Sequence, residues 1–176
     1  MLTRDPLFSE FARLLKDYGH HVVHIHKTSV LCPKCSSGQS GSGLEVNPDC
    51  DVCLGRGYQV VLKPELVRAS IYDRSNFDAF SETPIGILGP ENNIYFMKHT
   101  ASPTQGDLIA EVTWDKPGDE VVKYGNVLAV HHIYETKTVK AFRGQNGEVV
   151  YFKITTRPTE IEETRLAPIL KTKRPT

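Results

Sequence analysis

Four cysteines constrain this chain more than any other feature of its sequence. Cys32, Cys35, Cys50 and Cys53 form two C-x2-C pairs separated by fourteen residues, and the sequence has no other cysteine. Two thiolates placed two residues apart can turn onto one ion, and a second pair completes a tetrahedron of Zn–S bonds of about 2.3 Å. The separation is one residue short of the usual zinc-ribbon range. The pattern predicts a metal site made of all four cysteines.

The residues around the pairs support this prediction. Pro33 follows the first cysteine, and Gly55 and Gly57 follow the last, so both pairs are expected in turns whose N–H groups point at sulfur. The Ser/Gly-rich segment 36–49 can hardly pack by itself. Because four thiolates leave no open position for water or substrate, we expect one structural zinc per chain. Iron, two disulfides and free thiols are the alternatives.

Composition limits the class of protein. The 176 residues are 39% hydrophobic and 24% charged with a formal net charge of zero, which suits one domain or one domain with a small module. No apolar run reaches the roughly 18 residues of a membrane span, and the first residues lack the apolar core of a signal peptide. We therefore expect synthesis in a cytoplasm and no membrane partner. Zero net charge argues against a general polyanion binder.

The first residues carry the pattern of an amphipathic helix. Asp5 suits the N-cap, Pro6 the first helical position and Gly19 the stop. One apolar stripe at helical spacing is expected to pack in the core or, alternatively, to dock on a partner subunit. The stripe consists of Leu7, Phe8, Phe11, Leu14, Leu15 and Tyr18.

The rest of the chain reads as β structure. Asn146-Gly147 is its strongest hairpin signal. Strands are predicted at 20–31, 58–72, 93–99, 106–114, 126–134, 136–142 and 148–156. We predict a mainly β fold, a small β-barrel or sandwich with an N-terminal helix and an inserted zinc-knuckle loop. The expected parts are a helix and first strand (1–29), a zinc-binding insertion (30–57), a β-barrel domain (58–158) and an extended C-terminal arm (159–176).

No catalytic motif stands out, and we expect a protein that is not an enzyme. Phosphate-binding loops, G-x-S-x-G elbows and H-E-x-x-H pairs are absent from the sequence. Asp107 is interpreted as a turn residue opening a strand, and His131 and His132 as strand residues on opposite faces. Four further histidines are interpreted as ordinary strand or surface residues, one of which could replace a cysteine ligand: His20, His21, His24 and His26. Asp115 and Asp119 are likewise interpreted as structural.

The order of elements over 94–158 carries a resemblance to a known family. A short strand, the Gly106-Asp107 turn, an apolar strand from Val130 to Tyr134 and the Asn146-Gly147 hairpin follow one another. This order resembles the small β-barrel head-closure (stopper) and head-to-tail connector proteins in the neck of tailed bacteriophages, here with the zinc-knuckle module inserted. The resemblance implies a structural virion protein made in the host cytoplasm. It also implies a homo-oligomeric ring between portal or adaptor and tail that lets packaged DNA pass.

Two other classes stay open. The cysteine knuckles and the basic segment 165–176 are typical of a nucleic-acid-binding zinc-ribbon or OB-like protein. Residues 50–57 match once the C-x-x-C-x-G-x-G repeat of J-domain chaperones, which indicates a chaperone-like or adaptor zinc module. The long irregular stretch 73–92 is expected to be functional or partner-binding. The tail is expected to be a mobile arm or to dock on a neighbour.

Overall fold

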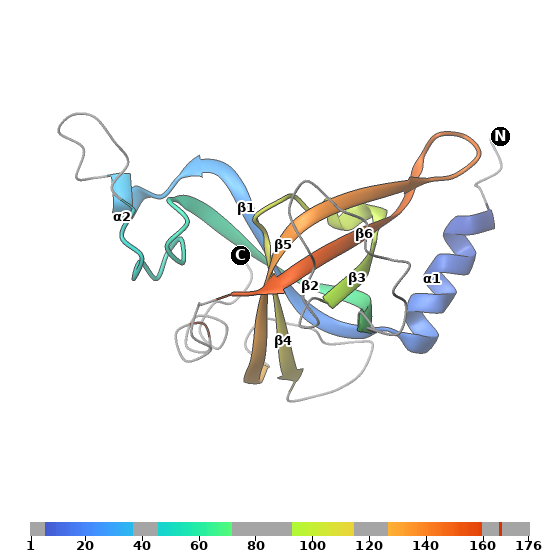
Figure 1. Ribbon diagram of the computed structural model, residues 1–176, viewed down its shortest axis with the longest axis horizontal. Coiled ribbons are helices and arrows are strands. Elements are labelled where there is room, and N and C mark those ends of the chain that lie inside the picture. The colour runs from blue at the N-terminus through green and yellow to red at the C-terminus, as the bar shows by residue number, and fades with distance from the viewer. Residues whose placement is uncertain (1–5, 37–45, 72–92, 115–126, 160–165, 167–176) are drawn as a thin grey trace, which may run out of the picture. The chain divides into compact units, whose positions relative to one another are not determined.

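The computed structural model describes residues 6–36, 46–71, 93–114, 127–159 and 166 (Figure 1). Asp5, the stretch 73–92, Asp115 and Asp119, for which the sequence made predictions, lie outside the described residues. Within the described part of the chain, no helix has the length and apolar character that crossing a bilayer requires.

Six strands close into an antiparallel β-barrel with the strand order β1-β2-β3-β6-β5-β4. The prediction of a mainly β fold with an N-terminal helix and an inserted cysteine loop is confirmed, and the architecture is a barrel. The elements in chain order are α1 (Pro6–Tyr18), β1 (His20–Leu31), α2 (Pro33–Ser36), β2 (Tyr58–Ile71), β3 (Asn93–Lys98), the short 3-10 helix η2 (His99–Ala101), β4 (Leu108–Trp114), β5 (Val127–Arg143) and β6 (Val149–Pro158).

The pairing of β1 with β4 closes the barrel. Val23 lies opposite Ala110, and Ile25 lies opposite Leu108. The first strand, which we grouped with the N-terminal helix, is therefore a barrel strand between β2 and β4. β1 is rich in β-branched residues, which favour a pleated and half-buried surface. It is buried on both faces from Val22 to Ile25.

The two strands expected at 126–134 and 136–142 form one continuous strand, β5. It pairs with β6 through a hairpin, and the register shifts between Thr136 and Thr138, where an irregularity interrupts the ladder. The turn at Asn146-Gly147 is confirmed. Gly147 has a φ of 78°, and the Gly144 N–H donates to the Glu148 carbonyl at 2.9 Å.

Contacts divide the described chain into two compact units, each with its own buried residues. The first holds α1, β3, β6 and parts of β2 and β5; the second holds the cysteine module, β4, most of β1 and the other parts of β2 and β5. The second unit is built around a core cluster of Val23, Ile25, Leu54, Leu62, Leu108, Ala110, Val127, Ile133 and Leu166. Leu166 belongs to the segment that we expected to be an extended arm, yet it is fully buried in this cluster.

Helix α1 has the bounds that its sequence predicts. The Gly19 N–H donates to the Leu15 carbonyl at 2.7 Å, at the C-terminal end of the helix. Leu15 is its fully buried residue, whereas Leu7 is 45% and Tyr18 71% exposed. Phe11 stacks on Tyr151 of β6, with ring centroids 4.7 Å apart. Core packing therefore accounts for only part of the apolar stripe, because part of it stays exposed to solvent.

Candidate metal centre

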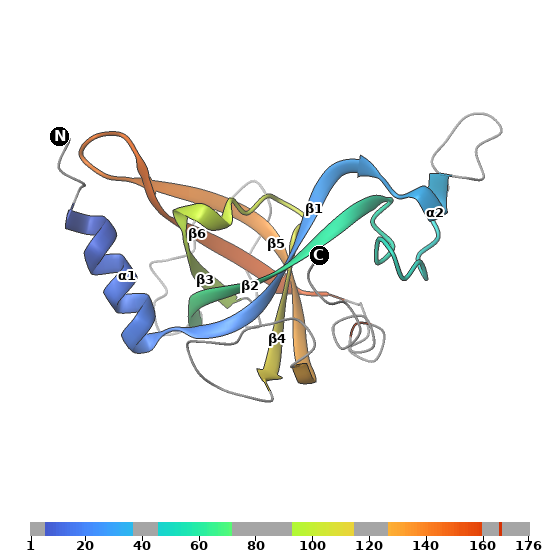
Figure 2. The same cartoon turned by 180° about the vertical axis from the view of Figure 1, so that it is seen from behind.

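The four cysteines lie in a module carried by β1 and β2. Both views show these two strands running side by side to the segment that contains α2 (Figure 1, Figure 2). Cys32 directly follows β1, and Cys35 lies in the single turn of α2. The Cys32 N–H donates to the Gly57 carbonyl at 2.9 Å, which ties the two ends of the module together. The expected insertion between two strands is thus present.

The sulfur atoms form a compact group. Sγ of Cys32 lies 3.7 Å from Sγ of Cys50, and Sγ of Cys35 lies 3.6 Å from Sγ of Cys53. All four ligand atoms lie within 4.8 Å of one another. Zn–S bonds of about 2.3 Å in a tetrahedron place sulfurs about 3.8 Å apart, whereas a disulfide requires about 2.05 Å. The cysteines are free thiols with the donor set and spacing of a metal site.

The turn after Cys50 holds the second pair in place. The Leu54 N–H donates to the Cys50 carbonyl at 2.9 Å, and the Arg56 N–H donates to the Cys53 carbonyl at 3.0 Å. Leu54 and Gly55 both have positive φ, 54° and 73°. A Cβ at Gly55 would lie 2.8 Å from the Pro48 carbonyl oxygen, so glycine is needed there for its φ and for the close approach of Pro48.

Among its described residues, 32–36 and 46–57, the module has almost no apolar core of its own. Its buried cluster consists of Cys32, Cys50 and Cys53, against which the half-buried Cys35 and Val52 pack. Thiols bury well but offer little apolar area for stability, and such small clusters usually depend on an ion that binds the folded form. The donor set and the poor core together fit a bound metal.

Without a metal, the thiols of Cys35, Cys50 and Cys53 have unequal acidities. A hydrogen bond with the Asn47 backbone favours the Cys35 thiolate, but burial and contacts with the other thiols outweigh it and raise the pKa of Cys35 to about 12. Burial disfavours the Cys50 thiolate, but the N–H groups of Cys53 and Val52 outweigh it and lower the pKa of Cys50 to about 7. Burial raises the pKa of Cys53. A cation that binds all four must therefore displace protons.

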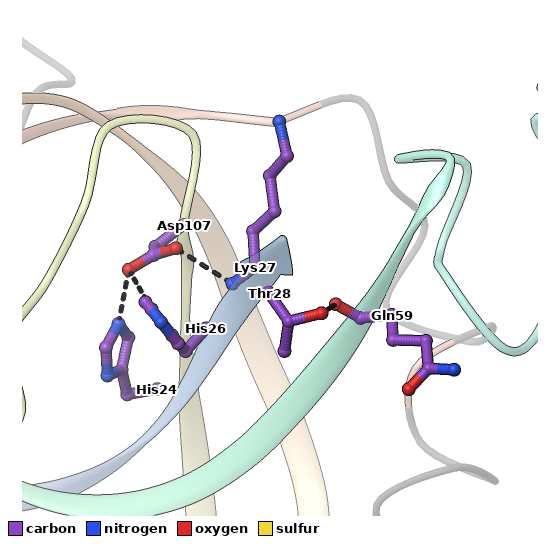
Figure 3. A network of polar contacts seen from close by, with 6 residues as sticks. All are labelled: His24, His26, Lys27, Thr28, Gln59 and Asp107. Carbon is purple, nitrogen blue, oxygen red and sulfur yellow. Dashed lines mark hydrogen bonds and ion pairs between the residues drawn. The ribbon is translucent and has the colours of Figure 1, made fainter. Parts of the chain in front are cut away.

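A second cluster of possible metal ligands surrounds Asp107 (Figure 3). Oδ2 of Asp107 lies 2.9 Å from Nε2 of His24 and 3.0 Å from Nδ1 of His26. Oδ1 of the same carboxylate accepts the Lys27 N–H at 2.9 Å. Beside this group, the Thr28 hydroxyl donates to the Gln59 carbonyl at 2.9 Å, which links β1 to β2.

The sequence predictions missed this cluster. His24 and Asp107 are fully buried. His24 lies in strand β1, as the sequence interpretation allowed, but it is not a surface residue. Asp107 opens β4 as expected, but its side chain also reaches two histidines of another strand. None of the histidines belongs to the cysteine cluster. The available signal was the i, i+2 spacing of His24 and His26, which places both on one face of a strand.

The remaining candidates stay apart from both clusters. His131 and His132 are exposed on β5, and the ring of His131 contacts the Thr113 hydroxyl of β4. The backbone carbonyl of His21 accepts a hydrogen bond from the Trp114 indole at 3.0 Å. The two groups of possible metal ligands found in the described chain are the four cysteines and the Asp107 cluster. No protein-family model matches the chain, and a search of curated proteins also finds no match.

Proposed function

We propose that this chain is a structural subunit of the neck of a tailed bacteriophage, a head-closure or connector protein. In this role it forms a homo-oligomeric ring between portal or adaptor and tail, and packaged DNA passes through the ring. The observation that carries the proposal is the closed β-barrel with an N-terminal helix and a metal-module insertion. It agrees with the fold that the resemblance over 94–158 implies.

Zinc is the ion that we propose for the four cysteines. Soft thiolates select zinc, copper(I) or iron–sulfur chemistry, and a closed tetrahedral S4 set suits structural zinc. Four protein ligands complete the coordination of the ion, which leaves no position for a substrate. The zinc would fold the end of the β1–β2 ribbon into a rigid tip that can contact a neighbouring protein.

The surface of α1 supports the ring. Leu7 and Tyr18 are large apolar side chains on an exposed helix face. A groove beside the helix is lined mostly by apolar side chains, together with two charged ones: Leu7, Phe11, Leu14, Phe96, Val150, Tyr151, Glu10 and Arg68. An exposed apolar strip of this kind suits contact with a second copy. The formal net charge of zero fits a channel protein that lets DNA slide without holding it.

Mass photometry and negative-stain electron microscopy of the full chain test the proposal. We expect rings, and we expect the double variant Leu7→Glu, Tyr18→Glu to dissociate them while the fold persists. Lys16→Glu, on the exposed polar face of the same helix, is the matched control and should leave rings intact. A strictly monomeric chain, alone and with portal or adaptor rings, would contradict the proposal. Tight DNA binding with a steep salt dependence would instead favour the nucleic-acid-binding alternative.

A further inference from the structure

The Asp107 carboxylate is buried between two imidazoles. Asp107 and His24 are fully buried, and the His26 side chain is 25% exposed. The three candidate ligand atoms, Nε2 of His24, Nδ1 of His26 and Oδ2 of Asp107, all lie within 4.8 Å of one another (Figure 3). One carboxylate oxygen thus faces both rings, and the other faces the backbone.

Strand pairing places these three side chains together. Ile25 of β1 lies opposite Leu108 of β4, and one further step of the antiparallel register brings Asp107 opposite His26. His24 is two residues away on the same face of β1. The Lys27 N–H fixes Oδ1, so Oδ2 is left directed at the rings. The ligands are therefore preorganised by two paired strands and a backbone donor, and metal ligands are commonly oriented by such hydrogen bonds.

The charge of the cluster favours a cation. An ionised carboxylate in a buried site costs several kcal/mol unless it is compensated. Both imidazoles can donate an N–H to this carboxylate and the Lys27 N–H donates to Oδ1, but each of these donors offsets less negative charge than a divalent cation would. The ammonium of Lys27 lies 4.3 Å from the centre of the Tyr58 ring, and Figure 3 shows this side chain extending away from Asp107.

The geometry points to a second metal site, in which His24, His26 and Asp107 bind a divalent transition-metal ion such as zinc. Two imidazoles and one carboxylate are a ligand set of zinc and of iron(II) sites. Metal–ligand bonds of about 2.0–2.1 Å in a tetrahedron require donor separations of about 3.3 Å. Oδ2 of Asp107 lies 2.9 Å from Nε2 of His24 and 3.0 Å from Nδ1 of His26. Each imidazole would need to move away from the carboxylate by a few tenths of an ångström to reach the required separation.

This site differs from the cysteine centre in two respects. Its nitrogen and oxygen donors do not share the preference of thiolates for soft ions. Three protein ligands also leave a fourth position for water, and the His26 side chain is partly exposed to solvent. The ion here is expected to exchange more easily than the ion of the four cysteines. It would link β1 to β4, the strand pair that closes the barrel.

Metal titration of the full chain, with the cysteine centre already filled by one equivalent of zinc, tests this inference. Isothermal titration with further Zn²⁺ should show a second, weaker site with one ion per chain. His26→Ala removes a partly exposed ligand and should weaken the second site at least tenfold. Asp107→Asn, which keeps the shape of the side chain but removes its charge, should abolish it. His132→Ala, an exposed histidine of β5 outside the cluster, is the matched control and should bind as the wild type does.

Two results would overturn the inference. The first is a wild-type chain that takes up no second ion. The second is a His26→Ala variant, with an unchanged far-ultraviolet circular dichroism spectrum, whose second site keeps wild-type affinity. Either result would show that His24, His26 and Asp107 form a hydrogen-bonded or ion-paired group that binds no metal. His26→Ala keeps the test decisive even if Asp107→Asn does not fold.

Discussion

Cys32 and Cys50 are eighteen positions apart in the sequence, yet their sulfur atoms lie 3.7 Å from each other. Cys35 and Cys53, separated by the same number of residues, meet at 3.6 Å. Each contact joins the first C-x2-C pair to the second, so the two pairs form one cluster. A loop whose four sulfurs bind one cation folds as a unit together with that cation.

Cys50→Ser should remove one ligand and cause local unfolding. We expect zinc affinity to fall by more than tenfold and residues 46–57 to lose protection from hydrogen exchange, while the barrel remains folded. The barrel strands pair without any contribution from the cysteines. Hydrogen exchange followed by mass spectrometry measures both regions in one experiment.

Lys34→Gln is the matched control for Cys50→Ser. It breaks an exposed ion pair in the same module, in which Nζ of Lys34 lies 2.6 Å from Oδ1 of Asp51. Such exposed pairs contribute little to stability because solvent screens them, so zinc affinity should stay close to wild type. Loss of the whole β signal in Cys50→Ser would show that the barrel depends on the module, contrary to the expected local unfolding.

Gly55→Ala should weaken the module more than Gly147→Ala weakens the hairpin. Both glycines have similar positive φ, 73° and 78°, so both variants carry a backbone cost of about 1–2 kcal/mol. A Cβ at Gly55 additionally meets the Pro48 carbonyl at 2.8 Å, whereas a Cβ at Gly147 meets nothing within 4 Å. Zinc competition assays should show reduced affinity for Gly55→Ala only. Equal zinc affinities in the two variants would refute the role assigned to this close approach.

Leu166→Ala should destabilise the protein by about 2–5 kcal/mol, as expected for a fully buried leucine. Leu166 belongs to the core cluster that also contains Ile25 and Leu108. Leu128→Ala, at a leucine that is 53% exposed, should change stability by less than about 0.5 kcal/mol. Urea unfolding followed by fluorescence compares the two variants. If both variants have the same urea midpoint, the Leu166 side chain does not stabilise the core.

Zinc binding should weaken as the pH falls. The bound thiolates carry no protons, whereas free Cys35, with a pKa raised to about 12, carries one throughout the neutral range. Free Cys50, with a pKa lowered to about 7, gains a proton as the pH falls through that value. For each proton that zinc displaces, the apparent zinc affinity falls about tenfold per unit decrease in pH. The Cys35 proton alone should therefore raise the apparent Kd about a hundredfold from pH 8 to pH 6, and the Cys50 proton should raise it further. Competition with a chelator of known pH dependence measures it, and a constant Kd would contradict these thiol acidities.

Local features of the sequence predicted local structure well. The C-x2-C spacing fixes which sulfurs can share an ion, because each pair is held within one turn. The Asn146-Gly147 turn and the helix from Pro6 to Tyr18 also depend on residues next to one another, and both are confirmed. The same holds for most strand positions, since alternation within a strand is a local pattern.

Contacts that depend on distant pairing were not predictable from the sequence. The cluster of His24, His26 and Asp107 exists because β1 pairs with β4 in one register, and no local pattern specifies that register. The same applies to Leu166, which follows mostly charged residues in the sequence. Its side chain belongs to a core cluster that contains residues of β1, β2, β4 and β5. For the stripe of helix α1, periodicity shows which side chains share a face but does not show how many of them contact the barrel.

The most direct test of the metal centre is X-ray absorption at the zinc edge of the full chain loaded with one equivalent of zinc. We predict a first coordination shell of four sulfurs at about 2.3 Å, without nitrogen or oxygen. A shell that contains imidazole or carboxylate ligands, or a chain that retains no zinc, would contradict the assignment of Cys32, Cys35, Cys50 and Cys53 as a closed structural metal centre.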